Sequence, residues 1–257
     1  MKKILVKLKY IGSNYVGWQV QKNGKSVQQT VQDAIEKIYG RRLDVTGCSR
    51  TDSGVHANEY CFTFIPPCEP QPFRVIASLN FALPSDMGVT DCILVDDDFH
   101  PRYSAIAKEY IYKIYGGHAR NPFLENRAYH YRRNINVDLM NEAAKYFVGK
   151  HDFRSFMANG SKIENTVRTI FYCEVKNLGD YVQIRICGDG FLYKMVRIIV
   201  GTLLSVNENK IKTTDIPNII CKKDRTAAGK TAPSHGLYLN KVFYDLKEVQ
   251  NIEKQLG

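Results

Sequence analysis

The chain has 257 residues, of which 44% are hydrophobic, which supports one large or two ordinary folded domains and excludes a disordered chain. Lys and Arg (36) outnumber Asp and Glu (26), and the formal net charge of +10 at pH 7 favours a polyanionic partner. The seven cysteines form no Cys-x-x-Cys pair and are odd in number, which disfavours a zinc site and a complete disulfide set. Without a signal peptide or a membrane-spanning apolar run, we expect a reduced, cytoplasmic, soluble protein.

The first part of the chain predicts a strand, a loop and a helix. Apolar side chains alternate with lysines over residues 4–10, which indicates a half-buried strand with a basic outer face. In the glycine-rich loop that follows, we expect Tyr15 and Trp18 to cap the core. Ser26, with a glutamine three residues later, predicts a capped helix that ends at Gly40.

Residues 47–57 read Gly-Cys-Ser-Arg-Thr-Asp-Ser-Gly-Val-His-Ala and separate a predicted strand at 43–48 from another at 60–65. A loop between two strands would present Asp52 rigidly. Arg50 would keep Asp52 ionised if the two lie close, and it could also reach a phosphate. The stretch fits a nucleophile or an anion-binding loop, and it fits equally well an Asx-turn beside a solvated arginine.

The middle of the chain predicts a further helix and strand, and then a domain boundary. Pro72 is well placed as the first residue of a helix that reaches Leu83, and residues 89–95 read as a strand. Asp96, Asp97 and Asp98 are interpreted as a solvated turn and not as a metal site, because consecutive residues on an extended chain point in alternate directions. The change of pattern that follows places the boundary after residue 104, with halves at 1–104 and 105–257.

The second half alternates strands and helices in a similar way. We predict strands at 108–115, 166–175, 181–187 and 237–244, a helix at 138–148 that Gly149 ends, and a hairpin turn at Gly179-Asp180. Residues 188–197 open a long apolar helix that reaches about residue 204. Arg197 is expensive to bury alone in so apolar a helix, so we expect it to have an anionic partner.

Five separated motifs, in order, resemble the TruA family of tRNA pseudouridine synthases. They lie at 10–19, 50–57, 99–112, 188–197 and 231–239, and together they span most of the chain. The sequence departs from the family pattern at Ile11, where an aspartate is usual, and at Ser49 and Ser53, which replace a glycine and an alanine. It also departs at 58–60, where Asn-Glu-Tyr replaces the commoner Gly-Gln-Val.

The resemblance implies an α+β fold, the pseudouridine synthase fold, with two similar sheet-and-helix halves and an active-site cleft between them. It also implies that Asp52 is the catalytic nucleophile, that Tyr110 contacts the target uracil, and that Arg197 is the partner of Asp52. A tyrosine suits that position because its ring can stack on a pyrimidine while its phenol exchanges a hydrogen bond or proton with it. Arg50 would hold the space of a flipped-out nucleotide or contact a backbone phosphate.

The expected activity is isomerisation of uridine to pseudouridine in tRNA, commonly at positions 38 to 40 of the anticodon stem-loop. We expect a homodimer, with no metal, no cofactor and no membrane partner, since the reaction involves no net redox change. One alternative is a non-catalytic RNA-binding module or tRNA-folding chaperone on the same scaffold. Another is a hydrolase that uses His151, Asp152 and Ser155, although such triads are recognised by geometry and not by closeness in sequence.

Overall fold

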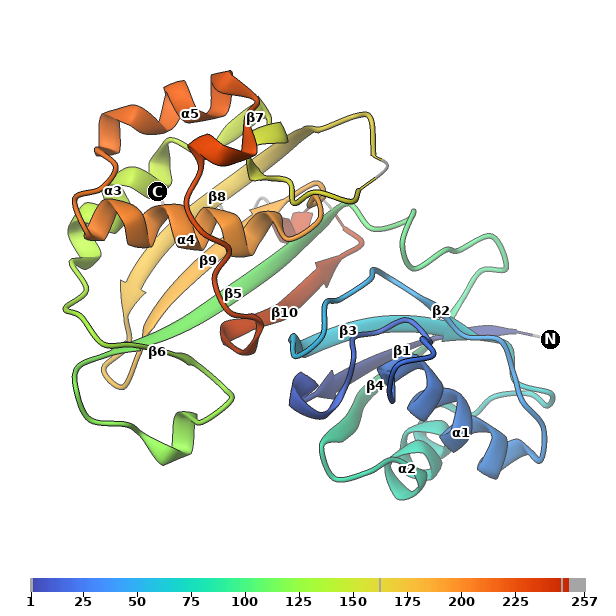
Figure 1. The fold of residues 1–257 in the computed structure, drawn as a ribbon. Coiled ribbons are helices and arrows are strands. Elements are labelled where there is room, and N and C mark those ends of the chain that lie inside the picture. The colour runs from blue at the N-terminus through green and yellow to red at the C-terminus, as the bar shows by residue number, and fades with distance from the viewer. Residues whose placement is uncertain (1, 162, 246, 250–257) are drawn as a thin grey trace. The chain divides into compact units, whose positions relative to one another are not determined.

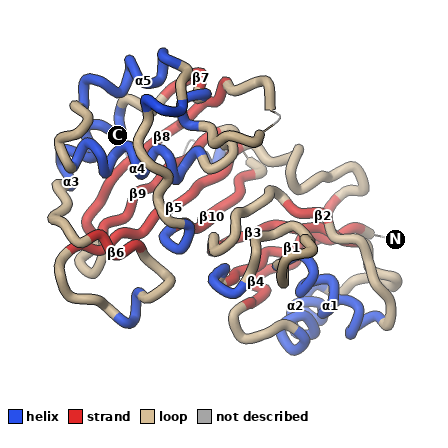
Figure 2. The backbone as a smooth tube through the Cα atoms, in the orientation of Figure 1, coloured by secondary structure: helices blue, strands red, loops and turns tan. Residues whose placement is uncertain are grey.

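A computed structural model describes residues 2–161, 163–245 and 247–249 and divides the chain into two compact units. The first unit contains residues 2–106 and 238–245, and the second contains residues 107–161, 163–237 and 247–249. In each unit a sheet carries helices, so the chain has the α+β class that the sequence predicted (Figures 1 and 2). In the part of the chain that is described, no helix is both long and apolar enough to span a bilayer.

The sheet of the first unit is built around β1, which pairs antiparallel with a strand on each side. Its strands, in spatial order, are β4 (Met87–Val95), β1 (Lys3–Tyr10), β3 (His56–Phe64) and β10 (Leu237–Phe243). The short strand β2 (Thr46–Gly47) also pairs with β3, and helices α1 (Val27–Tyr39) and α2 (Pro72–Ala82) pack in this unit. Strand β10 runs parallel to β3, with Tyr238 opposite His56, so residues 238–245 return to the first unit.

Helices α1 and α2 form where the sequence placed them, because their end signals are local. The Ser26 hydroxyl accepts a hydrogen bond from the amide of Gln29 at 3.2 Å, which satisfies one of the free amides of the first turn of α1. Gly40 ends α1 in the left-handed conformation, with φ at 69°. Pro72 is the first residue of α2, where its missing N–H costs nothing.

Strand β2 is much shorter than the predicted strand at 43–48. Only Thr46 and Gly47 pair with β3. The carbonyls of Leu43 and Val45 accept hydrogen bonds from glutamine side chains of α1, each at 3.2 Å. The backbone here is therefore satisfied by a helix surface and not by a strand partner, which hydrophobic alternation cannot predict.

The sheet of the second unit has four strands in the order β5 (Ala107–Gly116), β9 (Val182–Gly188), β8 (Val167–Asn177) and β7 (Gly149–Asp152). A further strand, β6 (Tyr129–Tyr131), pairs parallel to β5. The helices of this unit are α3 (Val137–Lys145), α4 (Met195–Asn207) and α5 (Ile216–Lys222). The predicted hairpin between β8 and β9 is confirmed, with Gly179 at φ 86°.

Two helices of this unit have ends that differ from the prediction. Helix α3 stops at Lys145 because the next amides bond three residues back, as Val148 does to Lys145, and Gly149 at φ 107° starts β7 instead. Helix α4 begins at Met195, and the residue before it, Lys194, has φ 59°. The predicted burial of α4 is confirmed, since Ile198 and Ile199 are fully buried.

Candidate active site

Asp52 lies in the loop between β2 and β3, where the sequence placed it. Its side chain is half-buried, and its carbonyl accepts a hydrogen bond from the amide of Val55 at 3.2 Å, which closes a tight turn. Gly54 takes a φ of 78° in that turn, a conformation that most other residues resist. Arg50 is exposed on the same loop. The chain thus presents a carboxylate on a turned, backbone-bonded segment of the first unit.

A second loop, residues 11–18, holds the Asp52 loop through backbone contacts. The amide of Trp18 donates to the carbonyl of Thr51 at 3.3 Å, and the amide of Gly54 donates to the carbonyl of Tyr15 at 3.2 Å. A Cβ on Gly17 would lie 2.4 Å from the Thr51 carbonyl oxygen. Glycine is required there because the two backbones approach too closely for any side chain.

Gly12 makes the same kind of contact at the far end of the Asp52 loop. A Cβ on Gly12 would lie 1.9 Å from the carbonyl oxygen of Val55, and its amide donates to Nδ1 of the buried His56 at 2.9 Å. The ring of His56 stacks on Tyr238 of β10 with centroids 4.5 Å apart. The first family motif therefore braces the aspartate loop, a role that local pattern did not reveal although both of its glycines stand out in the sequence.

Aromatic side chains pack against the loop that carries Asp52. Tyr15 and Trp18 are both buried, as predicted, and Trp18 stacks on Tyr60 at a centroid distance of 4.1 Å. The hydroxyl of Tyr60 donates to the carbonyl of Ser49, and the hydroxyl of Tyr10 lies 3.1 Å from that of Thr51. Tyr60 is one of the departures from the family pattern, and here it stabilises the loop that carries Asp52.

Two further departures, Ser53 and Ile11, also form hydrogen bonds to backbone carbonyls. The hydroxyl of Ser53, where the family has alanine, donates to the carbonyl of Tyr15 at 3.3 Å. The amide of Ile11 donates to the carbonyl of Asp86 at 2.9 Å. The structure offers no explanation for isoleucine in place of aspartate there.

Tyr110 lies on β5 in the second unit, opposite Ile186 of β9. Its side chain is buried, with 8% of its surface exposed, and its ring meets that of Phe191 edge-on at 5.0 Å. Tyr112, two residues along, points to the same side of the strand and donates to the carbonyl of Pro233 at 2.7 Å. Tyr112 therefore has a packing role, as the sequence suggested.

Arg197, on α4 of the second unit, is half-buried and oriented by the segment that precedes β10. Its Nε donates to the carbonyl of Ala232 at 2.7 Å, and the amide of Ala232 donates back to the Arg197 carbonyl at 3.0 Å. Close packing of this segment on α4 requires Gly201, where a Cβ would lie 1.6 Å from the carbonyl of Lys230. The guanidinium is thus held in one direction by backbone contacts.

His235 belongs to the same neighbourhood and was not among the predicted site residues. Burial lowers the pKa of its imidazole below the usual 6.5; the charge of Glu125 raises it, and the positive charge of Arg197 lowers it further. The ring of Tyr129 meets the imidazole edge-on at 6.2 Å. An imidazole that stays neutral beside a guanidinium adds no second positive charge to the neighbourhood.

The residues of the hydrolase alternative are engaged with the backbone or with other side chains. The hydroxyl of buried Ser155 donates to the carbonyl of Ile219 at 2.6 Å, and Nε2 of His151 lies 3.0 Å from the carbonyl of Val148. Asp152 forms an ion pair with Lys223 at 3.0 Å. This arrangement stabilises the β7 region and commits the Ser155 hydroxyl to a backbone acceptor instead of a catalytic histidine.

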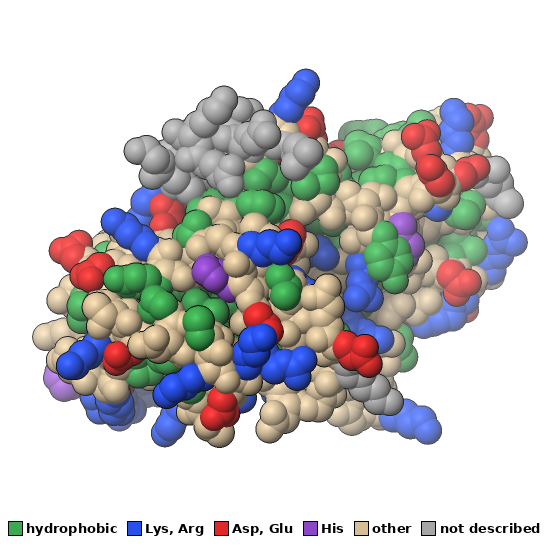
Figure 3. Space-filling view, turned by 90° about the horizontal axis from the view of Figure 1, so that it is seen from above, with side chains coloured by type: hydrophobic (Ala, Val, Ile, Leu, Met, Phe, Trp, Pro, Cys, Tyr) green, Lys and Arg blue, Asp and Glu red, His purple; other side chains and the backbone are tan. Residues whose placement is uncertain are grey.

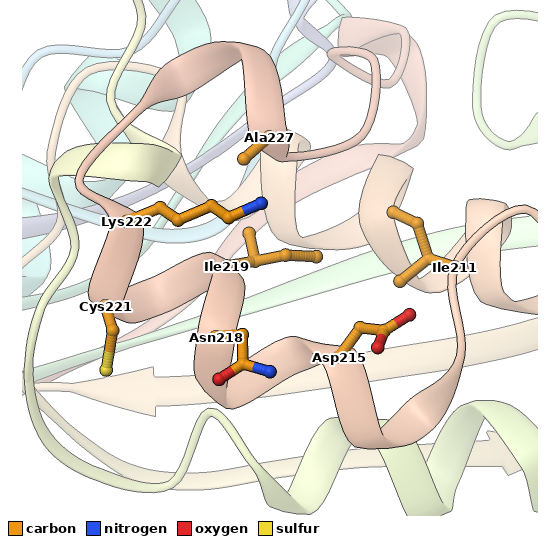
Figure 4. Close-up of a pocket in the computed structure, with 7 residues that line it drawn as sticks. All are labelled: Ile211, Asp215, Asn218, Ile219, Cys221, Lys222 and Ala227. Carbon is orange, nitrogen blue, oxygen red and sulfur yellow. The ribbon is translucent and has the colours of Figure 1, made fainter.

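A cavity of about 650 Å³ opens beside α5, and none of the predicted site residues (Arg50, Asp52, Tyr110 and Arg197) lines it. It is lined by Ile211, Asp215, Asn218, Ile219, Cys221, Lys222 and Ala227, and the Lys222 amine points toward Ala227 (Figure 4).

Lys and Arg side chains are spread over the face that Figure 3 shows, with Asp and Glu between them. Within residues 2–161, 163–245 and 247–249, no group of three His, Cys, Asp or Glu side chains could hold a metal ion.

Sequence comparisons with known proteins support the family that the motifs indicated. The family described as tRNA pseudouridine synthase matches residues 8–104 and 143–245, ranges that contain Asp52 and Arg197, whereas Tyr110 lies between them. The chain is 44% identical to tRNA pseudouridine synthase A of Ruminiclostridium cellulolyticum over 245 residues, which covers 95% of this chain and all of that one. It is 44% identical to the protein of that name from Clostridium acetobutylicum, with the same coverage, and 38% identical to that from Staphylococcus carnosus, over 97% and 93% of the two chains.

A solved structure titled "Crystal Structure of a Cbf5-Nop10-Gar1 Complex" overlaps with a TM-score of 0.39 at 11% identity, over 91% of this chain and 57% of that one, which is too little to support an argument. The family match covers well over half of the chain, and the relatives match along nearly its whole length. The chain therefore belongs to the tRNA pseudouridine synthase family. The resemblance to TruA that the motifs indicated is confirmed.

Proposed function

We propose that this protein isomerises uridine to pseudouridine in tRNA. The observation that carries the proposal is the Asp52 turn, which the glycine loop at 11–18 holds through backbone hydrogen bonds and contacts too close for a Cβ. Rigid presentation of a carboxylate suits a nucleophile, because the catalytic group is already oriented when the substrate arrives. Membership of the tRNA pseudouridine synthase family supports the same reaction.

In the proposed mechanism Asp52 adds covalently to the nucleoside, by analogy with carboxylates that attack anomeric carbons. The bond from N1 of uracil to C1′ of ribose breaks, and the free uracil turns. A bond from C5 to C1′ then forms as the bond from Asp52 to C1′ breaks and releases the carboxylate, the C5 proton is lost, and N1 ends protonated. Atoms and electrons balance within the substrate, so the scheme requires no cofactor.

Three further side chains have proposed roles. Tyr110 stacks on the uracil and assists removal of the C5 proton, and its edge-on contact with Phe191 supports this role because it fixes the plane of the phenol ring. Arg197, whose direction the Ala232 carbonyl fixes, holds the Asp52 carboxylate in its reactive orientation. Arg50, exposed on the Asp52 loop, contacts a phosphate or fills the space of the flipped-out nucleotide.

The positions of the target uridines and the oligomeric state are also part of the proposed function. We infer that the target uridines lie in the anticodon stem-loop, at positions 38 to 40, and that the protein acts as a cytoplasmic homodimer on one tRNA. The net charge of +10 supports a polyanionic substrate. Mapping of pseudouridine in tRNA from cells with and without the gene tests the target positions, and light scattering tests the dimer.

The decisive variant is Asp52→Asn, which keeps the size of the side chain and removes its charge. We expect it to abolish pseudouridine formation while tRNA binding is retained, because the variant loses the nucleophile and not the surface. Asp44→Asn is the matched control, since Asp44 is an exposed carboxylate that precedes the same loop, and it should turn over normally. Normal turnover by Asp52→Asn would refute the mechanism, and a wild-type protein that binds tRNA without forming pseudouridine would favour the non-catalytic RNA-binding module.

A further inference from the structure

The loop between β5 and β6 carries an exposed aromatic side chain that the proposed chemistry does not use. Residues 117–128 leave the end of β5 and return to β6, and a short 3₁₀ helix, Pro122–Leu124, lies within the loop (Figure 1). Phe123 in that helix is 86% exposed. Burial of this ring by a partner would be favourable, because its solvation in the isolated protein is unfavourable.

The loop is held in one conformation by its own hydrogen bonds. The side chain of Asn121 accepts from the amide of Phe123 at 3.0 Å, and the amides of Arg127 and Ala128 both donate to the carbonyl of Leu124. A partner would therefore meet a loop whose backbone is already ordered, and binding would lose little backbone conformational entropy.

The base of the loop is equally fixed. The rings of Tyr115 and His130 stack in parallel, with centroids 4.6 Å apart, and Nε2 of His130 lies 2.8 Å from the carbonyl of Gly117. Ile114 of β5 pairs with Tyr129 of β6 across the same base. The two strands thus anchor both ends of the loop to the sheet of the second unit.

Charge around Phe123 identifies the kind of partner. Residues 117–133 contain four exposed arginines and one acidic residue, Glu125. The arginines are Arg120, Arg127, Arg132 and Arg133. Arginines interleaved with an exposed aromatic ring are typical of surfaces that bind single-stranded nucleic acid, where bases stack and guanidinium groups meet phosphates.

We propose that the β5–β6 loop is an RNA-docking element in which Phe123 stacks on an unpaired base of the substrate and Arg120 and Arg132 contact its phosphates. This inference rests on the proposed function for its substrate class. It adds a binding site that is separate in sequence from Asp52, Tyr110 and Arg197. Because the contact is made with substrate before and during reaction alike, it contributes to affinity and not to the chemical step.

The test measures tRNA affinity of the full chain by fluorescence anisotropy, with single-turnover rates at saturating tRNA. Phe123→Ala should raise Kd roughly five- to 150-fold, the range expected for loss of one stacked base, while the saturated rate stays unchanged. Phe123→Trp should bind as the wild type does, because it keeps the stacking face. Phe81→Ala is the matched control, since Phe81 on α2 is 93% exposed, and its Kd should not change.

Salt dependence tests the arginines independently. Arg120→Gln should reduce the slope of log Kd against log salt by about 0.7 to 0.9, as loss of one phosphate contact predicts. Arg74→Gln, at an exposed arginine on α2, should leave the slope unchanged. Wild-type affinity in Phe123→Ala, or equal losses in Phe123→Ala and Phe81→Ala, would overturn the proposal.

Two other outcomes separate this inference from its alternatives. If light scattering shows that Phe123→Ala changes the oligomeric state while RNA affinity per subunit is constant, the loop binds a second copy of the chain and the proposal fails. If the wild type binds tRNA through Phe123 but forms no pseudouridine, the docking site stands and the proposed activity fails. Folding of each variant is checked by thermal unfolding. If the alanine variant unfolds, Phe123→Leu gives the readout, because leucine is apolar but has no ring to stack, and its Kd should also rise.

Discussion

The amide of Gly12 donates a hydrogen bond to Nδ1 of His56 at 2.9 Å, and both residues are buried in the first unit. The two residues are 44 positions apart, and the bond joins the loop at 11–18 to the end of the Asp52 loop. A buried amide that loses its acceptor costs about 1–3 kcal/mol, because water cannot replace the partner. This bond therefore contributes both to stability and to the position of Asp52.

We predict that His56→Leu lowers the free energy of unfolding by about 1–3 kcal/mol more than His56→Asn does. The amide oxygen of asparagine reaches the place of Nδ1 and keeps an acceptor for Gly12, whereas leucine has none. Urea unfolding of the two variants measures the difference. Equal stability would show that the Gly12 bond has little energetic weight.

Gly17→Ala should lower kcat by more than the accompanying loss in free energy of unfolding can explain. The new Cβ would lie 2.4 Å from the carbonyl of Thr51, so the residue next to Asp52 must move, and φ at 107° is itself unfavourable for alanine. Gly40→Ala isolates the backbone cost, because Gly40 also has positive φ but a methyl group added there would meet nothing within 4 Å. We expect Gly40→Ala to lose about 1 kcal/mol of stability with normal kcat, and Gly17→Ala to lose at least tenfold in kcat.

Ser155→Ala should leave pseudouridine formation unchanged and lower the free energy of unfolding by about 1–3 kcal/mol, since it removes the buried donor to the carbonyl of Ile219. A fluorophosphonate probe should not label the wild type, because Ser155 has a structural role. Labelling at Ser155 that is lost in the alanine variant would revive the hydrolase alternative.

His235 should titrate below its usual pKa of 6.5, and two variants should shift that pKa in opposite directions. Arg197→Gln removes a repelling positive charge and should raise the pKa, whereas Glu125→Gln removes an attracting negative charge and should lower it. NMR titration of the imidazole C–H signal measures both shifts. A shift of the wrong sign in either variant would show that the charge in question does not act on His235.

The same burial links stability to pH. Folding lowers the pKa of His235, so the unfolded chain binds the proton more tightly, and its contribution makes stability fall as pH drops below about 6.5. Above that pH the imidazole is neutral in both states and contributes no slope. His235→Gln should therefore flatten this part of the curve of unfolding free energy against pH.

The sequence by itself determined the elements whose signals are local. Ser26 and Gly40 mark the two ends of α1, Pro72 starts α2, and Gly179 turns the hairpin between β8 and β9, because capping, fixed φ and positive φ depend on near neighbours. The motif around Asp52 likewise indicates the family from the sequence alone.

Only the tertiary structure decided which distant backbones meet. It showed that glutamines of α1 take the place of a strand partner at Leu43 and Val45, and that β10 returns to pair with β3 in the first unit. It also showed that Gly12 and Gly17 let one loop close on the loop of Asp52. These contacts join residues far apart in the chain, and their free energy depends on close approach in three dimensions, which the spacing of residue types along a sequence does not encode.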